Sequence, residues 1–194
     1  MPTNQTSSGT SPHSIARPAG IFYLLNIITS LFAFTHKGTL ASASGFFAAG
    51  CYVTVTVLFY YLFKSVSRGL SLIAALFSLA GCAVGILSGF HLASLPINNL
   101  VFFGFYCILI GYLILRSTFL PRILGVLMGI AGLGWLTFLS PALARYFSPY
   151  HYIAGGIGEG LLTLWLLIMG VNSERWRQKA RGQTNSQSGV APAV

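Results

Sequence analysis

The sequence predicts an all-α fold: a polytopic membrane helical bundle of six transmembrane helices, with both termini inside (N-in, C-in). The first observation is composition, since 55% of the 194 residues are apolar and 7% are charged, with a mean hydropathy of +0.76. Soluble domains carry about 25% charged residues. Second, the apolar residues form six runs near the ~20 residues that cross a bilayer. Third, most Lys and Arg residues lie in alternate gaps between these runs.

The six runs lack the polar alternation of a membrane β-barrel, so each is predicted to be a helix. We expect the spans at residues 19–35, 45–63, 70–91, 98–115, 121–140 and 153–171. Turn-forming residues mark the gaps, among them Gly38, Pro96, Pro121 and Pro141. An alternative for the first run is a signal peptide cleaved near Ala43, which would leave five spans.

The remaining residues predict one membrane domain with two tails. Residues 1–16 are rich in Ser, Thr, Pro and Asn and predict a disordered cytoplasmic tail. Residues 17–171 form the transmembrane domain, and residues 172–194 predict a basic and then disordered cytoplasmic tail. No room is left for a soluble domain.

The distribution of basic residues predicts the orientation. Nine lie on the side of the termini: Arg17, Lys64, Arg68, Arg116, Arg122, Arg175, Arg177, Lys179 and Arg181. Two, Lys37 and Arg145, lie on the other side. Short cytoplasmic loops carry an excess of Lys and Arg, so both termini are predicted inside.

The net charge of +9 is explained by the lipid bilayer as partner. The basic residues are scattered among loops and form no stripe, which argues against nucleic acid. Contacts with lipid headgroups are predicted for Arg116, Arg122, Arg175 and Arg177. Aromatic rings near span ends, Trp135 and Trp176 among them, are predicted to lie at the membrane interfaces.

Small residues at spacings of three, four and seven give four spans a glycine face. The sets are Gly81, Gly85 and Gly89; Gly104, Cys107 and Gly111; Gly125, Gly129 and Gly132; and Gly156, Gly160 and Thr163. We predict packing within the chain, with a homo-oligomer through glycine faces as the alternative. The cysteines Cys51, Cys82 and Cys107 lie in apolar runs and predict packing, not disulfides.

Glu159 is the one acid inside a predicted span. It stands six residues after the predicted start of that span, about 9 Å deep, in the outer third. It shares a face with Gly155, Gly156 and Thr163, so its carboxyl should point into the bundle. An ionised acid there is unfavourable unless it is paired or reached by water. Two interpretations stay open: a functional group, or a structural hydrogen bond between helices.

Polar residues predicted on the same side of the membrane could surround Glu159. His91 ends the third span, Asn98 and Asn99 open the fourth, and His151 precedes the sixth. Together they predict an outward-facing ligand-binding pocket for a small molecule or lipid. No HExxH or comparable spacing is present, so neither a metal site nor a cofactor is predicted.

Three functions remain as hypotheses. The first is a non-enzymatic membrane protein that binds a small ligand or lipid at Glu159. The second is a small proton-coupled transporter or permease, which requires a water path past Glu159. The third is an intramembrane enzyme, which requires His91 or His151 within hydrogen-bond reach of the carboxyl. The sequence favours the first.

One stretch also resembles a known family. Residues 102–134, FFGFYCILIGYLILRSTFLPRILGVLMGIAGLG, resemble the bacterial membrane-protein family named domain of unknown function 4386 (DUF4386), and GEGLLTLWLLIMG at 158–170 resembles its last span. The resemblance is best over about 100–171. It implies a multi-span protein of the bacterial cytoplasmic (inner) membrane without an assigned activity, with Glu159 in the GEG motif. Only about ten residues separate the first two predicted spans, fewer than the resemblance implies.

Overall fold

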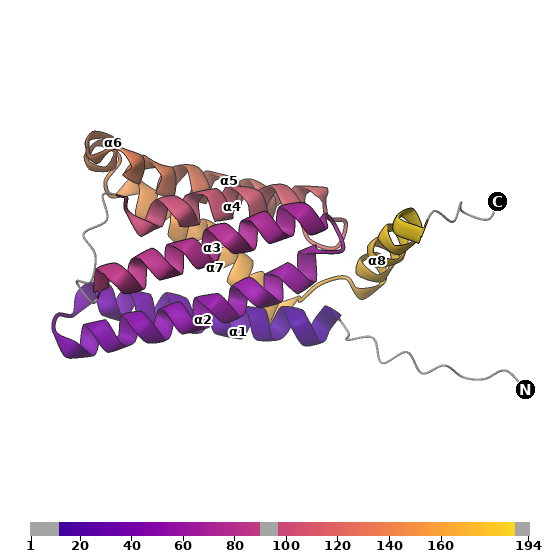
Figure 1. Ribbon diagram of the computed structural model, residues 1–194, viewed down its shortest axis with the longest axis horizontal. Coiled ribbons are helices and arrows are strands. Elements are labelled where there is room, and N and C mark those ends of the chain that lie inside the picture. Colours follow the sequence, from indigo (N-terminus) through magenta and orange to yellow (C-terminus); the bar gives the residue numbers. More distant parts are fainter. Residues whose placement is uncertain (1–11, 90–96, 189–194) are drawn as a thin grey trace, which may run out of the picture.

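The computed structural model describes residues 12–89 and 97–188, with side chains for 14–89 and 97–180. Within these ranges every regular element is helical, which confirms the all-α prediction (Figure 1). The elements are α1 (Pro12–Thr35), α2 (Thr39–Phe63), α3 (Arg68–Gly89), α4 (Asn99–Arg116), α5 (Arg122–Leu136), the 3-10 helix η1 (Thr137–Leu139), α6 (Pro141–Tyr146), α7 (Tyr150–Ile168) and α8 (Ser173–Ser188).

Six of these helices are long and apolar enough to cross a membrane: α1 to α4, α5 continued by η1, and α7. A helix satisfies its backbone hydrogen bonds internally, which the hydrocarbon core requires. The chain is therefore a multi-pass membrane protein with six candidate spans.

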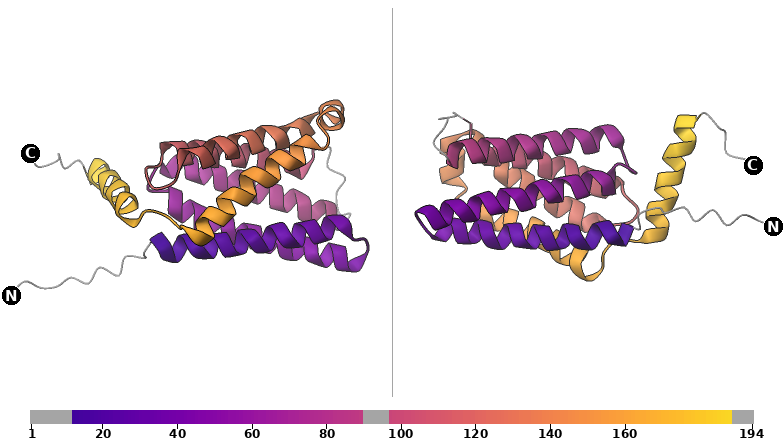
Figure 2. Two further views of the ribbon diagram at one scale, coloured as in Figure 1. Left: turned by 180° about the vertical axis from the view of Figure 1, so that it is seen from behind. Right: turned by 60° about the horizontal axis from the view of Figure 1, so that its bottom comes forward.

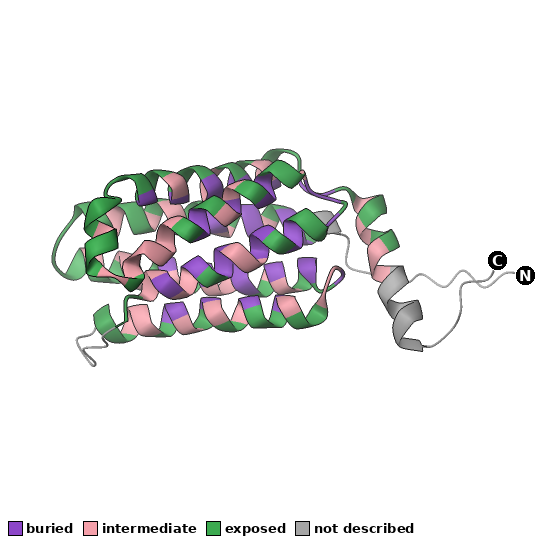
Figure 3. Cartoon of the chain, turned by 90° about the horizontal axis from the view of Figure 1, so that it is seen from above, coloured by how far each residue is buried: buried purple, intermediate pink, exposed green. Residues whose placement is uncertain are grey.

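The six long helices form a closed ring. Each packs against the next along the chain, from α1 to α5 and then α7, and α7 returns to pack against α1. Figures 1 and 2 show the start of α1 and the whole of α8 at the same end of this bundle. We call this the basic end, because Lys64, Arg68, Arg116 and Arg122 also lie at the helix termini there. Buried residues lie along the inward faces of the helices (Figure 3).

Glycine allows α4 and α5 to touch through their backbones. A Cβ atom on Gly132 would stand 2.7 Å from the carbonyl oxygen of Gly104, and one on Gly111 would stand 2.7 Å from that of Gly125. No side chain fits at these distances, so the predicted packing seam is confirmed at Gly104, Gly111, Gly125 and Gly132 but not at Gly129, which has nothing within 4 Å of where a Cβ would stand. Such close approach is how helices associate where lipid supplies no hydrophobic force.

The glycine face of α7 differs from the prediction. Gly156 and Gly160 have nothing within 4 Å of where a Cβ would stand, whereas a Cβ on Gly158 would lie 2.7 Å from a backbone oxygen of α5. Gly155 packs against the Trp135 ring. Of the predicted face Thr163 is buried, but the glycines that pack are about one residue away, which on a helix is a rotation of about 100°.

Three further differences from expectation are the start of α1, the start of α2 and the presence of α8. Helix α1 begins at Pro12, so residues 12–16 are helical where a disordered tail was predicted, and Ile15 and Ala16 are buried in the core. Proline suits the first turn of a helix. Helix α2 begins at Thr39 after Gly38, whose φ of 87° favours glycine. The connection between α1 and α2 therefore has three residues, not about ten.

The third difference is α8, a helix where the basic and then disordered tail was predicted. Its start is tied to the bundle, since the indole nitrogen of Trp176 donates to the carbonyl of Leu62 at 2.9 Å. In addition, Arg175 Nη1 donates to the carbonyl of Thr118 at 3.2 Å. These two bonds hold α8 at the basic end.

Candidate functional site

The carboxyl of Glu159 joins the helices of the ring. Its Oε2 accepts a hydrogen bond from the hydroxyl of Tyr23 on α1 at 3.0 Å, and its Oε1 accepts one from the indole nitrogen of Trp135 on α5 at 2.8 Å. The thiol of Cys107 on α4 lies 3.8 Å from Oε1. With Glu159 itself on α7, one side chain thus links four of the six spans.

Two local features position the hydrogen-bond donors. Gly155 lies one turn before Glu159 on α7, and a Cβ there would overlap the ring of Trp135. The glycine therefore makes room for the indole that donates to the carboxyl. Tyr23 is fully buried and packs edge-on against Tyr52 and Phe59, with ring centroids 5.6 and 5.9 Å away. These rings fix the direction of its hydroxyl.

The three groups that donate to the carboxyl in the described part of the chain are all uncharged. Trp135 can only donate, so Oε1 accepts from it whether or not the acid carries a proton. A proton on Oε2 would instead reverse the bond with Tyr23, since a hydroxyl both donates and accepts. The geometry therefore accommodates either protonation state of the acid.

Glu159 lines a partly open cavity of about 890 Å³ at the end opposite the basic end. All six spans contribute to its wall, which is mostly apolar. Its polar lining includes Asn26, Tyr52, Asn98, Asn99, Trp135 and Glu159. Cavities that bind small molecules span about 300–1,000 Å³ and combine apolar walls with a few placed polar groups. This one has that size and chemistry.

The predicted site residues have different places relative to this cavity. Asn98 and Asn99 line it, and the side chain of Asn98 also accepts from the backbone of Leu100 at 3.0 Å, capping α4. His151 does not line the cavity. Its side chain is buried, with 3% of its surface exposed, and its ring packs edge-on against Phe138. His91 lies outside the described residues.

Glu159 is deeper in its helix than predicted. Helix α7 begins at Tyr150, so Glu159 is the tenth of its 19 residues. At about 1.5 Å per residue, the carboxyl-bearing residue lies roughly 14 Å from the helix start. The acid thus occupies the middle of the helix instead of its outer third, because the polar residues His151 and Tyr152 belong to the helix.

Sequence reasoning missed the two strongest partners of the carboxyl. Trp135 was predicted to lie at a membrane interface, and Tyr23 was not considered. The usable signal was chemical: buried indole N–H and phenol O–H groups need partners. Glu159 is the one acid in the six apolar runs and is therefore a strong acceptor for both.

Comparisons with known proteins identify the family of this chain. Residues 98–170 match the family described as "Domain of unknown function (DUF4386)", a match that covers α4 to α7 and includes Asn98, Asn99, Trp135 and Glu159. An "Uncharacterized protein" of Archaeoglobus fulgidus is 31% identical over 161 residues, which cover 75% of this chain and 94% of that protein. No solved structure matches the chain. The chain belongs to the DUF4386 family.

Proposed function

We propose that this protein is a non-enzymatic receptor of the bacterial cytoplasmic membrane that binds a small amphipathic ligand or lipid around Glu159. The observation that carries the proposal is the placement of one carboxyl, held by uncharged donors, in the wall of a large and mostly apolar cavity. The excess of cations at the basic end supports placing the mouth of the cavity on the outer side.

The lining indicates the chemistry of the ligand. Apolar walls accommodate an alkyl or ring-shaped body, because burying apolar surface stabilises by about 25 cal/mol per Å². The carboxyl favours a polar group that donates hydrogen bonds, such as an amine, since charge-assisted bonds are about twice as strong as neutral ones. Asn98 and Asn99 line the same cavity and offer the ligand further polar contacts.

Contacts with lipid headgroups are part of the same proposal. All four predicted contacts are exposed on the basic end: Arg116 and Arg122 at helix ends, and Arg175 and Arg177 in the first turns of α8. Phosphate groups of the inner leaflet lie at that depth, and each basic residue near an anionic surface contributes about 1 kcal/mol.

The other two hypotheses find less support. A transporter requires a polar path from Glu159 toward the basic end, yet Ile110, Leu113, Leu162 and Leu166 are buried in the apolar core there. The enzyme hypothesis requires His91 or His151 at the carboxyl; His151 makes no hydrogen bond to it in the described part of the chain, and His91 lies outside that part. Ligand binding is therefore the function that the geometry supports best.

Trp135 provides a built-in probe for the test. A brominated alkyl chain quenches tryptophan fluorescence at contact, so a bromoalkylamine can be titrated into nanodiscs containing the protein. The quenching lost in Trp135→Phe gives the signal from the cavity. We expect Glu159→Gln to weaken amine binding by roughly 10- to 150-fold, because a hydrogen bond to a charged group contributes about 1.5–3 kcal/mol. A bromoalkyl carboxylate of equal length serves as the control ligand.

Two results would refute the proposed function. One is amine quenching that Trp135→Phe leaves unchanged, which would place the probe in bulk lipid. The other is equal amine affinity in wild type and in a folded Glu159→Gln variant, which would remove the carboxyl from the site.

A further inference from the structure

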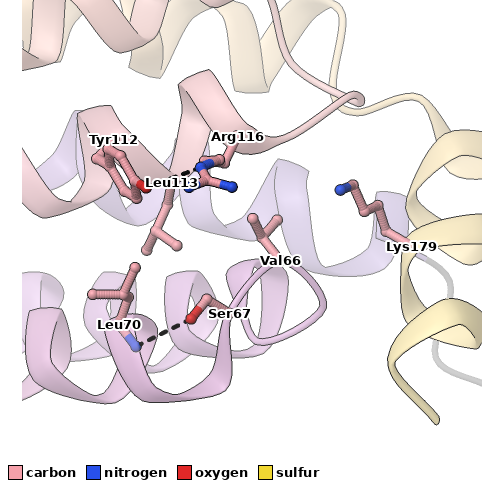
Figure 4. Close-up of a pocket in the computed structure, with 7 residues that line it drawn as sticks. All are labelled: Val66, Ser67, Leu70, Tyr112, Leu113, Arg116 and Lys179. Atoms are coloured by element: carbon pink, nitrogen blue, oxygen red, sulfur yellow. Dashed lines mark hydrogen bonds between the residues drawn. The ribbon is translucent and has the colours of Figure 1, made fainter. Parts of the chain in front are cut away.

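A second, smaller cavity lies at the basic end of the bundle (Figure 4). Its volume is about 270 Å³. Three regions line it: the turn from α2 into α3, the last turns of α4, and α8. The lining residues are Val66, Ser67, Leu70, Tyr112, Leu113, Arg116 and Lys179. Residues distant in sequence thus meet where a bilayer has its headgroups.

Two cations from different helices converge on this cavity. Figure 4 shows the ammonium of Lys179 and the guanidinium of Arg116 directed toward each other across it. The Nε of Arg116 donates to the hydroxyl of Tyr112 at 2.9 Å, and its guanidinium carbon lies 5.3 Å from that ring. Tyr112 therefore holds the arginine through one nitrogen, and Figure 4 shows one terminal nitrogen on the side of Lys179.

Lys179 reaches the cavity because α8 is fixed to the bundle. The bond from Trp176 to the carbonyl at the end of α2 lies one helical turn before Lys179. Helix α8 then crosses the basic end with the lysine on the side of α4 (Figure 4). The lysine is partly buried there, so its position depends on this anchoring.

The charges that line the cavity are unbalanced. The chain has two acids, Glu159 and Glu174, and neither lines it. Glu159 lies in the middle of α7, and Glu174 is exposed at the start of α8. Two like charges facing one space repel each other, whereas an anion between them would attract both. The start of α3 borders the same cavity, where the backbone N–H of Leu70 donates to the Ser67 hydroxyl at 3.5 Å (Figure 4).

We propose that this cavity binds a phosphate group, supplied by an anionic phospholipid of the adjacent leaflet. Arg116 offers the planar pair of donors that matches phosphate oxygens, and Lys179 adds a point charge. Leu70 and Leu113 form the wall on the apolar side, where the glycerol and first acyl carbons of a phospholipid would lie. The site does not depend on the ligand proposed for Glu159 and lies at the other end of the bundle.

Native mass spectrometry of the protein released from nanodiscs tests this proposal. The discs contain phosphatidylglycerol in phosphatidylcholine, and the probe is the retention of the first phosphatidylglycerol. We expect the double variant Arg116→Gln, Lys179→Gln to bind that lipid roughly 30-fold more weakly, because both charged contacts with the phosphate are lost. The matched control, Arg17→Gln with Lys64→Gln, removes two exposed charges of the basic end that do not line the cavity and should stay within about threefold.

Each outcome decides the proposal. Equal losses in the two double variants would show attraction to surface charge in general and would overturn the site. Protection of the detergent-solubilised protein against heat by inorganic phosphate, without preference for phosphatidylglycerol, would overturn the lipid as the source. Lys179→Gln alone provides a milder test if the double variant does not fold, because its side chain lies on α8 outside the ring of spans. Unchanged lipid retention in that variant would also refute the site.

Discussion

Replacing Glu159 by Gln or by Leu tests whether the carboxyl holds the helices together through uncharged donors. Gln can keep both bonds, since its amide oxygen accepts from Trp135 and its amide nitrogen donates to the Tyr23 oxygen. We expect the free energy of unfolding to fall by less than about 1 kcal/mol. In Glu159→Leu, both donors lose their acceptor.

The expected magnitude for Glu159→Leu follows from the burial of these donors. Tyr23 is 0% exposed, so its orphaned hydroxyl costs about 1–3 kcal/mol. Trp135 is partly exposed, and a hydrogen bond between membrane helices averages about 0.6 kcal/mol. The sum is a loss of about 2–4 kcal/mol, measurable by reversible unfolding of the protein in bicelles with SDS.

A double-mutant cycle with Tyr23→Phe isolates the bond between α1 and α7. In the Leu background Tyr23→Phe should cost nothing further, because the hydroxyl already lacks its acceptor. If Glu159→Leu has the same free energy of unfolding as Glu159→Gln, the reasoning is refuted, because the hydrogen bonds of the carboxyl would then not stabilise the bundle. If Glu159→Gln loses as much unfolding free energy as Glu159→Leu, the reasoning is refuted too, because stability would then require the negative charge and not the hydrogen bonds.

Three further predictions concern packing, orientation and α8. Gly132→Leu should abolish the monodisperse peak in size-exclusion chromatography, because a Cβ at Gly132 would stand 2.7 Å from a backbone oxygen of α4. The control Gly129→Leu should keep that peak, because nothing lies within 4 Å of where its Cβ would stand. In a cysteine-free background, Lys37→Cys should react with an impermeant maleimide from outside and Thr118→Cys should not; the reverse pattern would invert the predicted orientation. Trp176→Phe should speed tryptic cleavage within α8 about fivefold, the equivalent of one hydrogen bond of about 1 kcal/mol; unchanged cleavage would show that the indole does not anchor it.

The number and order of the spans could be predicted because the bilayer imposes them. An apolar run near 20 residues has few alternatives to a helix that crosses. Counting the membrane crossings placed Asn98, Asn99 and Glu159 on the same side of the membrane. All three line one cavity in the structure. The inward direction of Glu159 followed from the small residues on its face.

Other features were not encoded in any local pattern. The bond between Tyr23 and Glu159 joins residues 136 positions apart, and hydropathy does not indicate which helices become neighbours. The early start of α2 was missed because Thr, Ala and Ser contribute little to an apolar run although they fit a helix. The rotation of α7 by one residue decided which glycines pack, and that rotation depends on the fit of Gly155 to the Trp135 ring.

The closure of the ring between α1 and α7 has a consequence for biogenesis. Helix α1 leaves the ribosome first, but α7, which carries the acceptor for the Tyr23 hydroxyl, is the last of the six spans to be made. At about 5–20 residues per second, the 136 residues between the two partners take roughly 7–27 s to synthesise. During that interval α1 has only one of its two ring neighbours, α2, and the wall of the Glu159 cavity is incomplete. The cavity is therefore assembled only when synthesis of the membrane domain ends.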